Sequence, residues 1–312
     1  FILPIKPMLR ALWKPCNTTT SLIPAKSLVT NNLLICTDLD RTLIPNGPQP
    51  ESRGARQAFS ELVQHPEITL AYVSGRHHRL VKEAIRNYQL PMPDYVIGDV
   101  GSSIYQLDSN NSWQINHQWQ QTISADWADK SHAELKQLLS NIKQLRLQET
   151  GKQNDFKLSY YVPLQSDRQR LNTLIQTRLQ QAGIKANLIW SIDEPAGIGL
   201  LDILPVSASK YHAIQALMQW QGFSPANTVF CGDSGNDMEV LVSPIPAVLV
   251  ANSQPAIQQQ ALAGADQRGH TEQLYIAKGR LPGMNGNYSA GMLEGILHYY
   301  PHCRAWISRP II

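Results

Sequence analysis

Three short apolar runs, far apart in the chain, are each followed at once by polar residues. The runs are residues 33–37, 70–73 and 228–231. The polar stretches after them begin at Asp38, Ser74 and Gly232. A run of four or five apolar residues that is closed by a turn residue is typical of a buried parallel strand. Ligands of an open α/β sheet bind beyond the carboxyl ends of its strands, so we expect these polar stretches to meet at one edge of one sheet.

Alternating strands and helices surround these runs on both sides of the chain. The pattern predicts helices over 52–64 and after Gly75, a strand over 95–97 and a small hairpin from Ile104. It resumes at Ser209 with a helix over 209–221, a strand over 228–231, a helix over 235–242, a strand over 247–250 and a helix over 255–263. This βαβ order predicts a doubly wound, mostly parallel α/β core of Rossmann-like type.

The middle of the chain has a different pattern. It predicts helices over 126–143 and 167–182 and half-exposed antiparallel strands over 145–148, 157–162, 188–190 and 200–204. A chain that leaves a parallel sheet, builds a second α+β module and then returns is a core with an inserted cap. We expect a core of residues 31–117 and 206–302, a cap of 118–205, and a poorly ordered leader of 1–30.

Composition limits the partners of this protein. The first four basic residues precede any acidic one, and the rest of the chain carries 23 basic and 24 acidic residues. This near-neutral body has no basic stripe, so we expect no nucleic-acid partner. No apolar run approaches the ~20 residues of a membrane span. Cys36 and Cys231 lie in predicted core strands, as in proteins of a reducing compartment. We expect a cytoplasmic monomer without a membrane or nucleic-acid partner.

The residues at the strand ends suit phosphate-ester hydrolysis. Asp38 can attack phosphorus and form an aspartyl-phosphate, which splits a very slow reaction into two easier steps. Asp40 can protonate the leaving alkoxide and later activate water. Two anions would repel each other here, so the chemistry calls for a hard cation such as Mg²⁺, with Asp233 and Asp237 as further ligands.

Phosphoryl oxygens need donors as well as a cation. Ser74 and the backbone N–H groups beside it, including that of Gly75, are expected at a helix N-terminus, which favours phosphate. Lys210, in the first turn of the helix after the last cap strand, can supply a point charge to the transition state.

These four stretches resemble the motifs of the haloacid dehalogenase (HAD) superfamily of phosphohydrolases. The resemblance implies that Asp38 is the nucleophile, that Asp40 is the general acid/base, and that Ser74 and Lys210 bind phosphate. It adds Asn236 on the phosphate side. It also implies that Asp38 and Asp233 bind the metal through side chains and Asp40 through its carbonyl, and that Asp237 completes the site. A cap between the second and third motifs is similar to that of subclass IIB, with a C2B-type cap.

Within that subclass the chain resembles the sucrose-6-phosphate phosphatase family over roughly residues 31 to 300. The segments that carry this resemblance are 99–105, 157–161, 201–205, 250–254 and 291–295. There are also departures. Arg41 stands where Gly or Asn is common, His77 and His78 follow Arg76, and residues 279–290 are longer and richer in glycine than expected.

The cap should hold the sugar, because amide, carboxylate and ammonium groups recognise hydroxyls. The candidates in the cap are Gln153, Asn154, Lys157, Ser159 and Asp193. We therefore expect a Mg²⁺-dependent phosphatase that converts sucrose 6-phosphate to sucrose and phosphate.

Several alternatives stay open. One is the same chemistry on mannosyl-3-phosphoglycerate, glucosyl-glycerate phosphate or trehalose phosphate, and another is a phosphomutase. A third is a phosphatase-like binding domain of a sucrose-phosphate synthase. Such a binding-only domain would be expected to have lost Asp38, Asp40 or Asp233, and all three are present.

Overall fold

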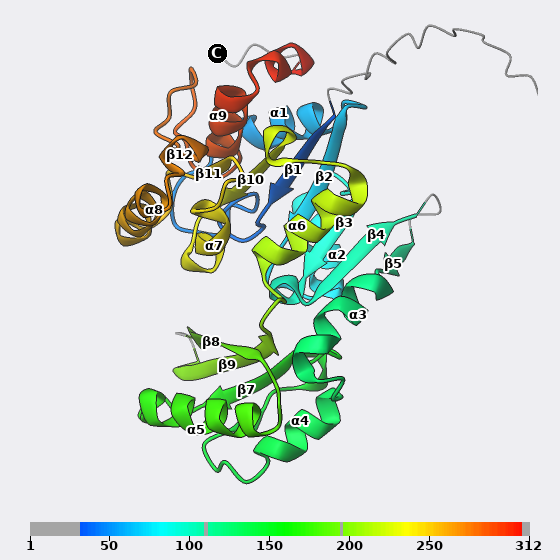
Figure 1. Ribbon diagram of the computed structural model, residues 1–312. Coiled ribbons are helices and arrows are strands. Elements are labelled where there is room, and N and C mark those ends of the chain that lie inside the picture. Colours follow the sequence, from blue (N-terminus) through cyan, green and yellow to red (C-terminus); the bar gives the residue numbers. More distant parts are fainter. Residues whose placement is uncertain (1–31, 109–111, 194–195, 308–312) are drawn as a thin grey trace, which may run out of the picture. The chain divides into compact units, whose positions relative to one another are not determined.

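A computed structural model describes residues 32–108, 112–193 and 196–307 of the chain. The predicted leader, residues 1–30, lies outside the described residues. An eight-stranded sheet forms the core in the order β12-β11-β10-β1-β2-β3-β4-β5 (Figure 1). Its strands are β1 (Leu33–Thr37), β2 (Ile68–Val73), β3 (Tyr95–Gly98), β4 (Ser103–Leu107), β5 (Trp113–Ile115), β10 (Thr228–Gly232), β11 (Ala247–Leu249) and β12 (Leu274–Ile276). Pairing is parallel from β12 to β3 and antiparallel at β4 and β5.

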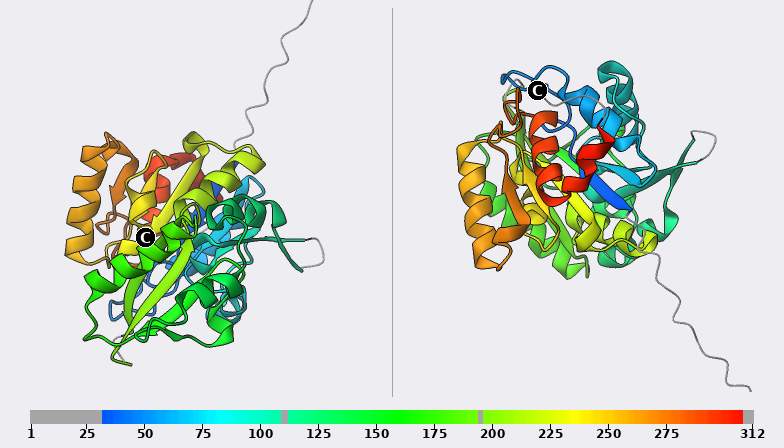
Figure 2. Two further views of the ribbon diagram at one scale, coloured as in Figure 1. Left: turned by 60° about the horizontal axis from the view of Figure 1, so that its bottom comes forward. Right: turned by 90° about the horizontal axis from the view of Figure 1, so that it is seen from above.

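Helices cover both faces of this sheet. They are α1 (Ala55–Val63), α2 (His78–Tyr88), α3 (His117–Ser124), α6 (Lys210–Gln221), α7 (Met238–Leu241), α8 (Pro255–Gln267) and α9 (Ser289–Tyr299). In β1, Leu33 and Ile35 belong to a hydrophobic cluster that includes residues of α1, α2 and α9, while Leu34 and Cys36 belong to a second cluster that includes residues of α3, α6, α7 and α8. Figure 2 shows α9, in red, on the side of the sheet that also carries α1. The predicted doubly wound, mostly parallel α/β core is therefore confirmed.

The cap has an antiparallel sheet of its own. The order is β6-β7-β9-β8, from the strands β6 (Arg146–Leu147), β7 (Leu158–Val162), β8 (Ala186–Asp193) and β9 (Ile198–Pro205). The helices α4 (His132–Leu139) and α5 (Arg168–Gln181) pack on one face of it. Side chains alternate along β9, so Leu201 and Ile203 enter the cap core while Leu200 and Asp202 face the other way. The expected α+β cap is confirmed as a class of fold.

One helix prediction is wrong. The range 126–143, predicted as one helix, holds the end of a 3₁₀ turn at Ala125–Trp127 and then only the short helix α4, while α3 ends before this range begins. Helix α4 starts at a capping box in which Ser131 and Glu134 satisfy each other's backbone N–H groups. Trp119 and Ile123 of α3 pack in the core cluster. The predicted domain boundaries at 117/118 and 205/206 stay predictions.

The strand β12 and the full extent of α9 were not predicted. β12 has three residues and is only half-buried, so it carries little periodic signal. The described cysteines, Cys36, Cys231 and Cys303, are free and buried. Among the described residues, no helix is both long enough and apolar enough to cross a membrane.

Candidate active site

The carboxyl ends of three adjacent strands bring the predicted acidic residues together. β10, β1 and β2 are neighbours in the sheet, and Asp233, Asp38 and Ser74 follow them directly. Asp38, Asp40, Ser74 and Asn236 line a cavity of about 300 Å³ at this edge. The sequence prediction that these polar stretches meet at one sheet edge is what the structure shows.

Lys210 lies beneath this cavity and ties the acidic residues together. Its Nζ donates to Asp38 Oδ1 at 2.7 Å, to Asp237 Oδ1 at 2.6 Å and to Asn236 Oδ1 at 3.1 Å. The ammonium group is only 2% exposed. Burial alone would lower the pKa of Lys210, but the charges of Asp237 and Asp38 outweigh burial and raise it, so the lysine stays protonated.

Two local features place Lys210 there. Ser209 caps α6, because its hydroxyl accepts from the His212 N–H, and Lys210 is the first helical residue. The chain also approaches itself closely at this point: a Cβ on Gly101, whose φ is +100°, would overlap the Ser209 backbone. Glycine at 101 therefore lets the loop after β3 pack against the start of the helix that carries the lysine.

Asp237 is packed under the loop that follows β10. Its Oδ2 accepts from the backbone N–H groups of Asp233, at 3.1 Å, and Ser234, at 3.2 Å. Gly232 makes room for it, since a Cβ there would lie 2.6 Å from Asp237 Oδ2. With Lys210 on its other oxygen, Asp237 holds this loop and the lysine in one arrangement.

Asp40 is held by an ion pair across the mouth of the cavity. Arg76 Nε and Nη2 lie 2.7 and 2.6 Å from its two carboxylate oxygens, and Asn46 donates to it at 2.7 Å. Burial acts to raise the pKa of Asp40, but the hydrogen bonds and charge of Arg76 outweigh it and leave the pKa below its ordinary value. Asp40 is thus poised as a carboxylate, which suits a base more than an acid until Arg76 releases it.

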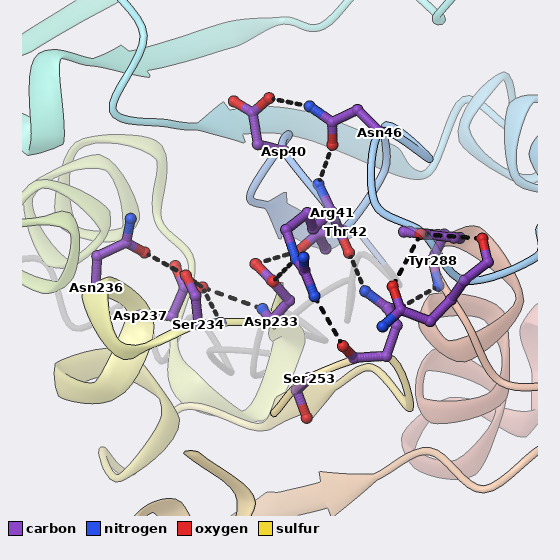
Figure 3. A network of polar contacts seen from close by, with 12 residues as sticks. Asp40, Arg41, Thr42, Asn46, Asp233, Ser234, Asn236, Asp237, Ser253 and Tyr288 are labelled. Atoms are coloured by element: carbon purple, nitrogen blue, oxygen red, sulfur yellow. Dashed lines mark hydrogen bonds and ion pairs between the residues drawn. The ribbon is translucent and has the colours of Figure 1, made fainter. Parts of the chain in front are cut away.

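A second arginine, Arg41, contacts the acidic cluster at Asp233 (Figure 3). Arg41 Nε lies 3.1 Å from Asp233 Oδ2, and its Nη2 donates to the Asn252 carbonyl at 3.2 Å. Figure 3 also shows that Asn46 contacts both Asp40 and the backbone of Arg41. The position that departs from the family pattern is therefore directly at the predicted metal ligand.

The acid set fits a divalent cation. Among the described residues, Asp38, Asp233 and Asp237 place carboxylate oxygens within 4.8 Å of one another, and all three are buried. Hard carboxylate oxygens suit Mg²⁺. Burial is the main cause that raises the pKa of Asp38 to about 8 and that of Asp233 to about 6, and neighbouring carboxylates add to it. Buried acids that resist ionisation on their own are what a bound cation would neutralise.

This arrangement predicts a stability that depends on pH and on metal. Folding raises the pKa of Asp38 and Asp233 above the value of about 3.9 that an aspartate has in an unfolded chain. Stability without metal should therefore fall as pH rises from about 4 towards about 8. A cation binds the ionised form of these carboxylates.

Mg²⁺ at 100 times its dissociation constant at pH 8 should raise the melting temperature by roughly 5–10 °C at that pH. The same concentration should raise it by much less at pH 5, where the carboxylates are protonated and bind the cation more weakly. Thermal unfolding in EDTA and in Mg²⁺ at both pH values measures this, and an equal gain at both would contradict it.

The structure differs from the prediction at Ser74 and Gly75. Both line the cavity, but α2 begins at His78 with His77 as its N-cap, so the helix starts further along than expected. The Ser74 hydroxyl instead accepts from the Arg76 N–H at 3.2 Å. The loop 74–77, and not the first turn of α2, therefore offers donors to the cavity.

Of the five cap candidates, Lys157 alone lines the cavity. The Gln153 amide is taken up by the backbone of Gln148 and Ser159, and the Ser159 hydroxyl donates to the Lys152 carbonyl and to Asp202. Asn154 donates to Ser102 of the core at 2.9 Å, and Asp193 accepts from the Ala196 N–H. The structure thus places these four in supporting contacts of the cap.

The cavity also includes residues that the sequence reasoning missed. They are Arg76, His77, Leu80, Gln148, Lys152, Leu200, Asp202 and Ser234. Lys157 Nζ lies 3.8 Å from carboxylate oxygens of both Asp99 and Asp202. Period-two alternation along β9 was the available signal for Asp202, because Leu201 and Ile203 fix the opposite face as core.

A doubly wound core with an inserted cap sheet, and an acidic cluster at the carboxyl ends of its strands, define a HAD-like phosphoric monoester hydrolase. The chain belongs to the Sucrose-6F-phosphate phosphohydrolase family, whose sequence pattern matches residues 31–300. It is therefore related to the sucrose-phosphatases, a group of HAD-like sugar-phosphate hydrolases.

Individual proteins agree with this assignment. A HAD-like hydrolase of Nitrosococcus oceani is 52% identical over 276 residues, which are 88% of this chain and 74% of that protein. Sucrose-phosphatase 1 of Nicotiana tabacum is 32% identical over 75% of this chain and 53% of its own length. The chain thus spans about half the length of this plant relative. The sucrose-phosphatase of Synechocystis, solved with sucrose and phosphate, matches with a TM-score of 0.65 and 27% identity over 86% of this chain and 98% of that one.

Proposed function

We propose that this protein hydrolyses a sugar phosphate, with sucrose 6-phosphate as its substrate, through a phosphorylated Asp38 and with Mg²⁺. The observation that carries the proposal is that Asp38 and Asp40 line the same cavity as polar residues of the cap sheet. One wall of the cavity supplies phosphate chemistry, and the opposite wall supplies groups that hydrogen-bond to hydroxyls. The solved Synechocystis relative, which holds sucrose and phosphate, supports sucrose 6-phosphate as the substrate.

Asp38 is the nucleophile in this proposal. One of its oxygens accepts from Lys210, which fixes the carboxylate and leaves the other oxygen for attack on phosphorus. Lys210 stays charged and can stabilise the negative charge on the phosphoryl oxygens in the transition state. The loop of Ser74 and Gly75, together with Asn236, faces the same cavity and can bind the remaining oxygens.

Asp40 moves the proton in both half-reactions. It protonates the leaving sugar oxygen and then accepts a proton from the water that hydrolyses the phospho-Asp38 bond. Its present partner Arg76 would have to loosen first, and Asp40 would then take up a proton from solvent before it can act as the acid. The proton that it later accepts from the attacking water restores this protonated form for the next cycle. An anionic substrate that enters beside Arg76 offers the guanidinium a competing partner.

The proposed metal ligands are the carboxylates of Asp38, Asp233 and Asp237 and the carbonyl of Asp40. When bound, Mg²⁺ would screen the charge between nucleophile and phosphate. Asp237 has the least freedom of the three carboxylates, because Lys210 and two backbone N–H groups already occupy its oxygens.

Substrate choice would lie with the cap side of the cavity. Lys157 and Asp202 offer an ammonium and a carboxylate, groups that bind sugar hydroxyls. Gln148 lines the same cavity, and its amide nitrogen donates to the Tyr160 carbonyl, which leaves its amide oxygen as the group on offer. A volume of about 300 Å³ is at the lower end of small-molecule sites and admits a sugar phosphate.

Phosphate release from a substrate panel tests the proposal. The panel is sucrose 6-phosphate, mannosyl-3-phosphoglycerate, trehalose 6-phosphate, glucose 6-phosphate and p-nitrophenyl phosphate, each with Mg²⁺ and with EDTA. We expect Mg²⁺-dependent release with the highest kcat/KM on sucrose 6-phosphate. A higher value on another sugar phosphate would keep the chemistry and move the substrate, whereas no release from any would favour a binding domain.

Lys157 gives a sharper test of the cap assignment. Replacement by Met removes a charged donor from the sugar side without touching the acidic cluster, so KM for the preferred sugar phosphate should rise about tenfold or more. Turnover of p-nitrophenyl phosphate, which has no sugar, should stay within about twofold of the wild type. Lys143→Met, an exposed cap lysine, is the matched control. Equal losses on both substrates would contradict a role in sugar recognition.

A further inference from the structure

Arg41 has a backbone conformation that favours glycine. Its φ is 59°, in the left-handed region, where most side chains are strained. Two side-chain amides compensate. The Arg41 N–H donates to Asn46 Oδ1 at 2.8 Å, and the Arg41 carbonyl accepts from Asn252 Nδ2 at 2.7 Å. The residue is thus held on both sides in a position that it would not adopt by itself.

Asn252 is anchored in turn. Its side chain is buried, and its Oδ1 accepts from the backbone N–H of Tyr288, a second residue with a left-handed φ of 51°. The Tyr288 hydroxyl donates to the Gln49 carbonyl at 3.2 Å. The buried Asn252 amide therefore joins the loop after β1, at Arg41, to the start of α9, at Tyr288. Figure 3 labels both Arg41 and Tyr288 in this network.

The Arg41 side chain reaches from the rim to a buried carboxylate. Its exposed fraction is 34%, against 4% for Asp233, and Nε and Asp233 Oδ2 are 3.1 Å apart. The guanidinium lies at the end of a four-bond stem and can exchange its two contacts, with Asp233 and with the Asn252 carbonyl, for water, whereas the buried Asp233 cannot follow it. A divalent cation, with twice the charge of the guanidinium, could therefore replace Arg41 as the partner of Asp233.

Charge favours such a competition. Asp38, Asp233 and Asp237 together carry three negative charges when ionised, and Lys210 and Arg41 return two positive ones. A divalent cation among the carboxylates would lie close to the guanidinium, and like charges at such a distance in a partly buried site repel strongly. Removal of the guanidinium would leave the acidic cluster more negative and would leave Asp233 with the Thr42 hydroxyl, which donates to its Oδ1 at 3.5 Å, in place of a charged partner.

We infer that Arg41 is a built-in counter-ion of the acidic cluster, which a divalent cation must displace from Asp233, and that it sets the affinity of the site for that cation. The inference rests on the proposed function, which makes the cluster a metal site. It gives the departure at residue 41 a purpose: the metal-free site stays neutralised, and the cation is held more weakly than the carboxylates alone would hold it.

Calorimetric titration with Mg²⁺ tests this without substrate or turnover. The proteins are the wild type, Arg41→Gln, Arg41→Gly and, as a charge-matched control, Arg53→Gln, an exposed arginine before α1. All are stripped with EDTA and titrated in a buffer free of phosphate. Glycine adopts the left-handed backbone at residue 41 without strain, so Arg41→Gly should fold even if Arg41→Gln does not.

Both Arg41 variants should bind Mg²⁺ at least about fivefold more tightly than the wild type, and Arg53→Gln should stay within about twofold. Unchanged or weaker binding in Arg41→Gly would overturn the inference, because Arg41 would then orient Asp233 for the cation or take no part. A wild type that binds no Mg²⁺ would overturn both the inference and the proposed metal site. Phosphate release that persists in that case would leave the hydrolase assignment intact.

Discussion

Replacement of Asp38 by Asn should reduce phosphate release to below about 1% of the wild type, because the nucleophile serves both half-reactions. Asn is isosteric but does not attack phosphorus. Its amide oxygen can still accept from Lys210, which lies 2.7 Å from Asp38 Oδ1, so the fold should persist. Because burial disfavours the Asp38 carboxylate, the variant without metal should melt no lower than the wild type at pH 8.

The measurement is steady-state phosphate release together with thermal unfolding in EDTA. A reaction with substrate that is radiolabelled in its phosphate group is quenched with acid, and the label bound to protein is counted. The wild type should carry label on Asp38, and Asp38→Asn should carry none. Asp266→Asn, an exposed position in α8, is the matched control and should keep full activity. Residual turnover above about 1% with an unchanged pH profile would remove Asp38 from the role of nucleophile.

Replacement of Lys210 by Met should damage both stability and activity. The ammonium group is 2% exposed and contacts the carboxylates of Asp38 and Asp237. A buried charge that loses its partner typically costs about 3–5 kcal/mol. The phosphate would also lose a fixed positive charge, and loss of one such group costs roughly 10²–10³ in kcat.

Chemical denaturation and kinetics separate these two effects. In EDTA at pH 8 the midpoint of Lys210→Met should fall clearly, and at pH 5, where protonated Asp38 needs no counter-ion, the loss should be smaller. Mg²⁺ should restore part of the stability and little of the rate. Lys136→Met, an exposed helical lysine of α4, should match the wild type in both measurements. Wild-type stability at pH 8 would show that the buried ion pairs contribute nothing to folding.

The core could be predicted from the sequence because its strands are short apolar runs that end in polar residues. Parallel pairing of β10, β1 and β2 then fixes where Asp38, Ser74 and Asp233 meet, whatever the details of the loops. The start of α4 was also present in the sequence, as Ser131 followed three residues later by Glu134, which is the pattern of a capping box.

The partners of the long side chains could not be predicted. That Arg76 pairs with Asp40 and Arg41 with Asp233 depends on the direction in which each guanidinium leaves its loop, and spacing carries no such information. In the cap, Gln153 and Ser159 are the residue types that bind sugars, yet their polar atoms satisfy the backbone of neighbouring turns. Residue type suggests a binding role, and local hydrogen-bond geometry decides whether the side chain is available for it.

The position of β1 in the sheet has a consequence for synthesis of the chain. β1 lies between β2, which follows it closely in the sequence, and β10, which comes much later. The pairing with β10 begins at Leu34 of β1 and Thr228 of β10. At a translation rate of about 5–20 residues per second, the β10 side of β1 would wait roughly 10–40 seconds on the ribosome before its partner emerges. During that time the β10 side of the strand presents unpaired backbone N–H and C=O groups, which are a template for pairing with other chains. The inserted cap lengthens this delay, so the order of the strands prolongs the period in which β1 is open to wrong pairing.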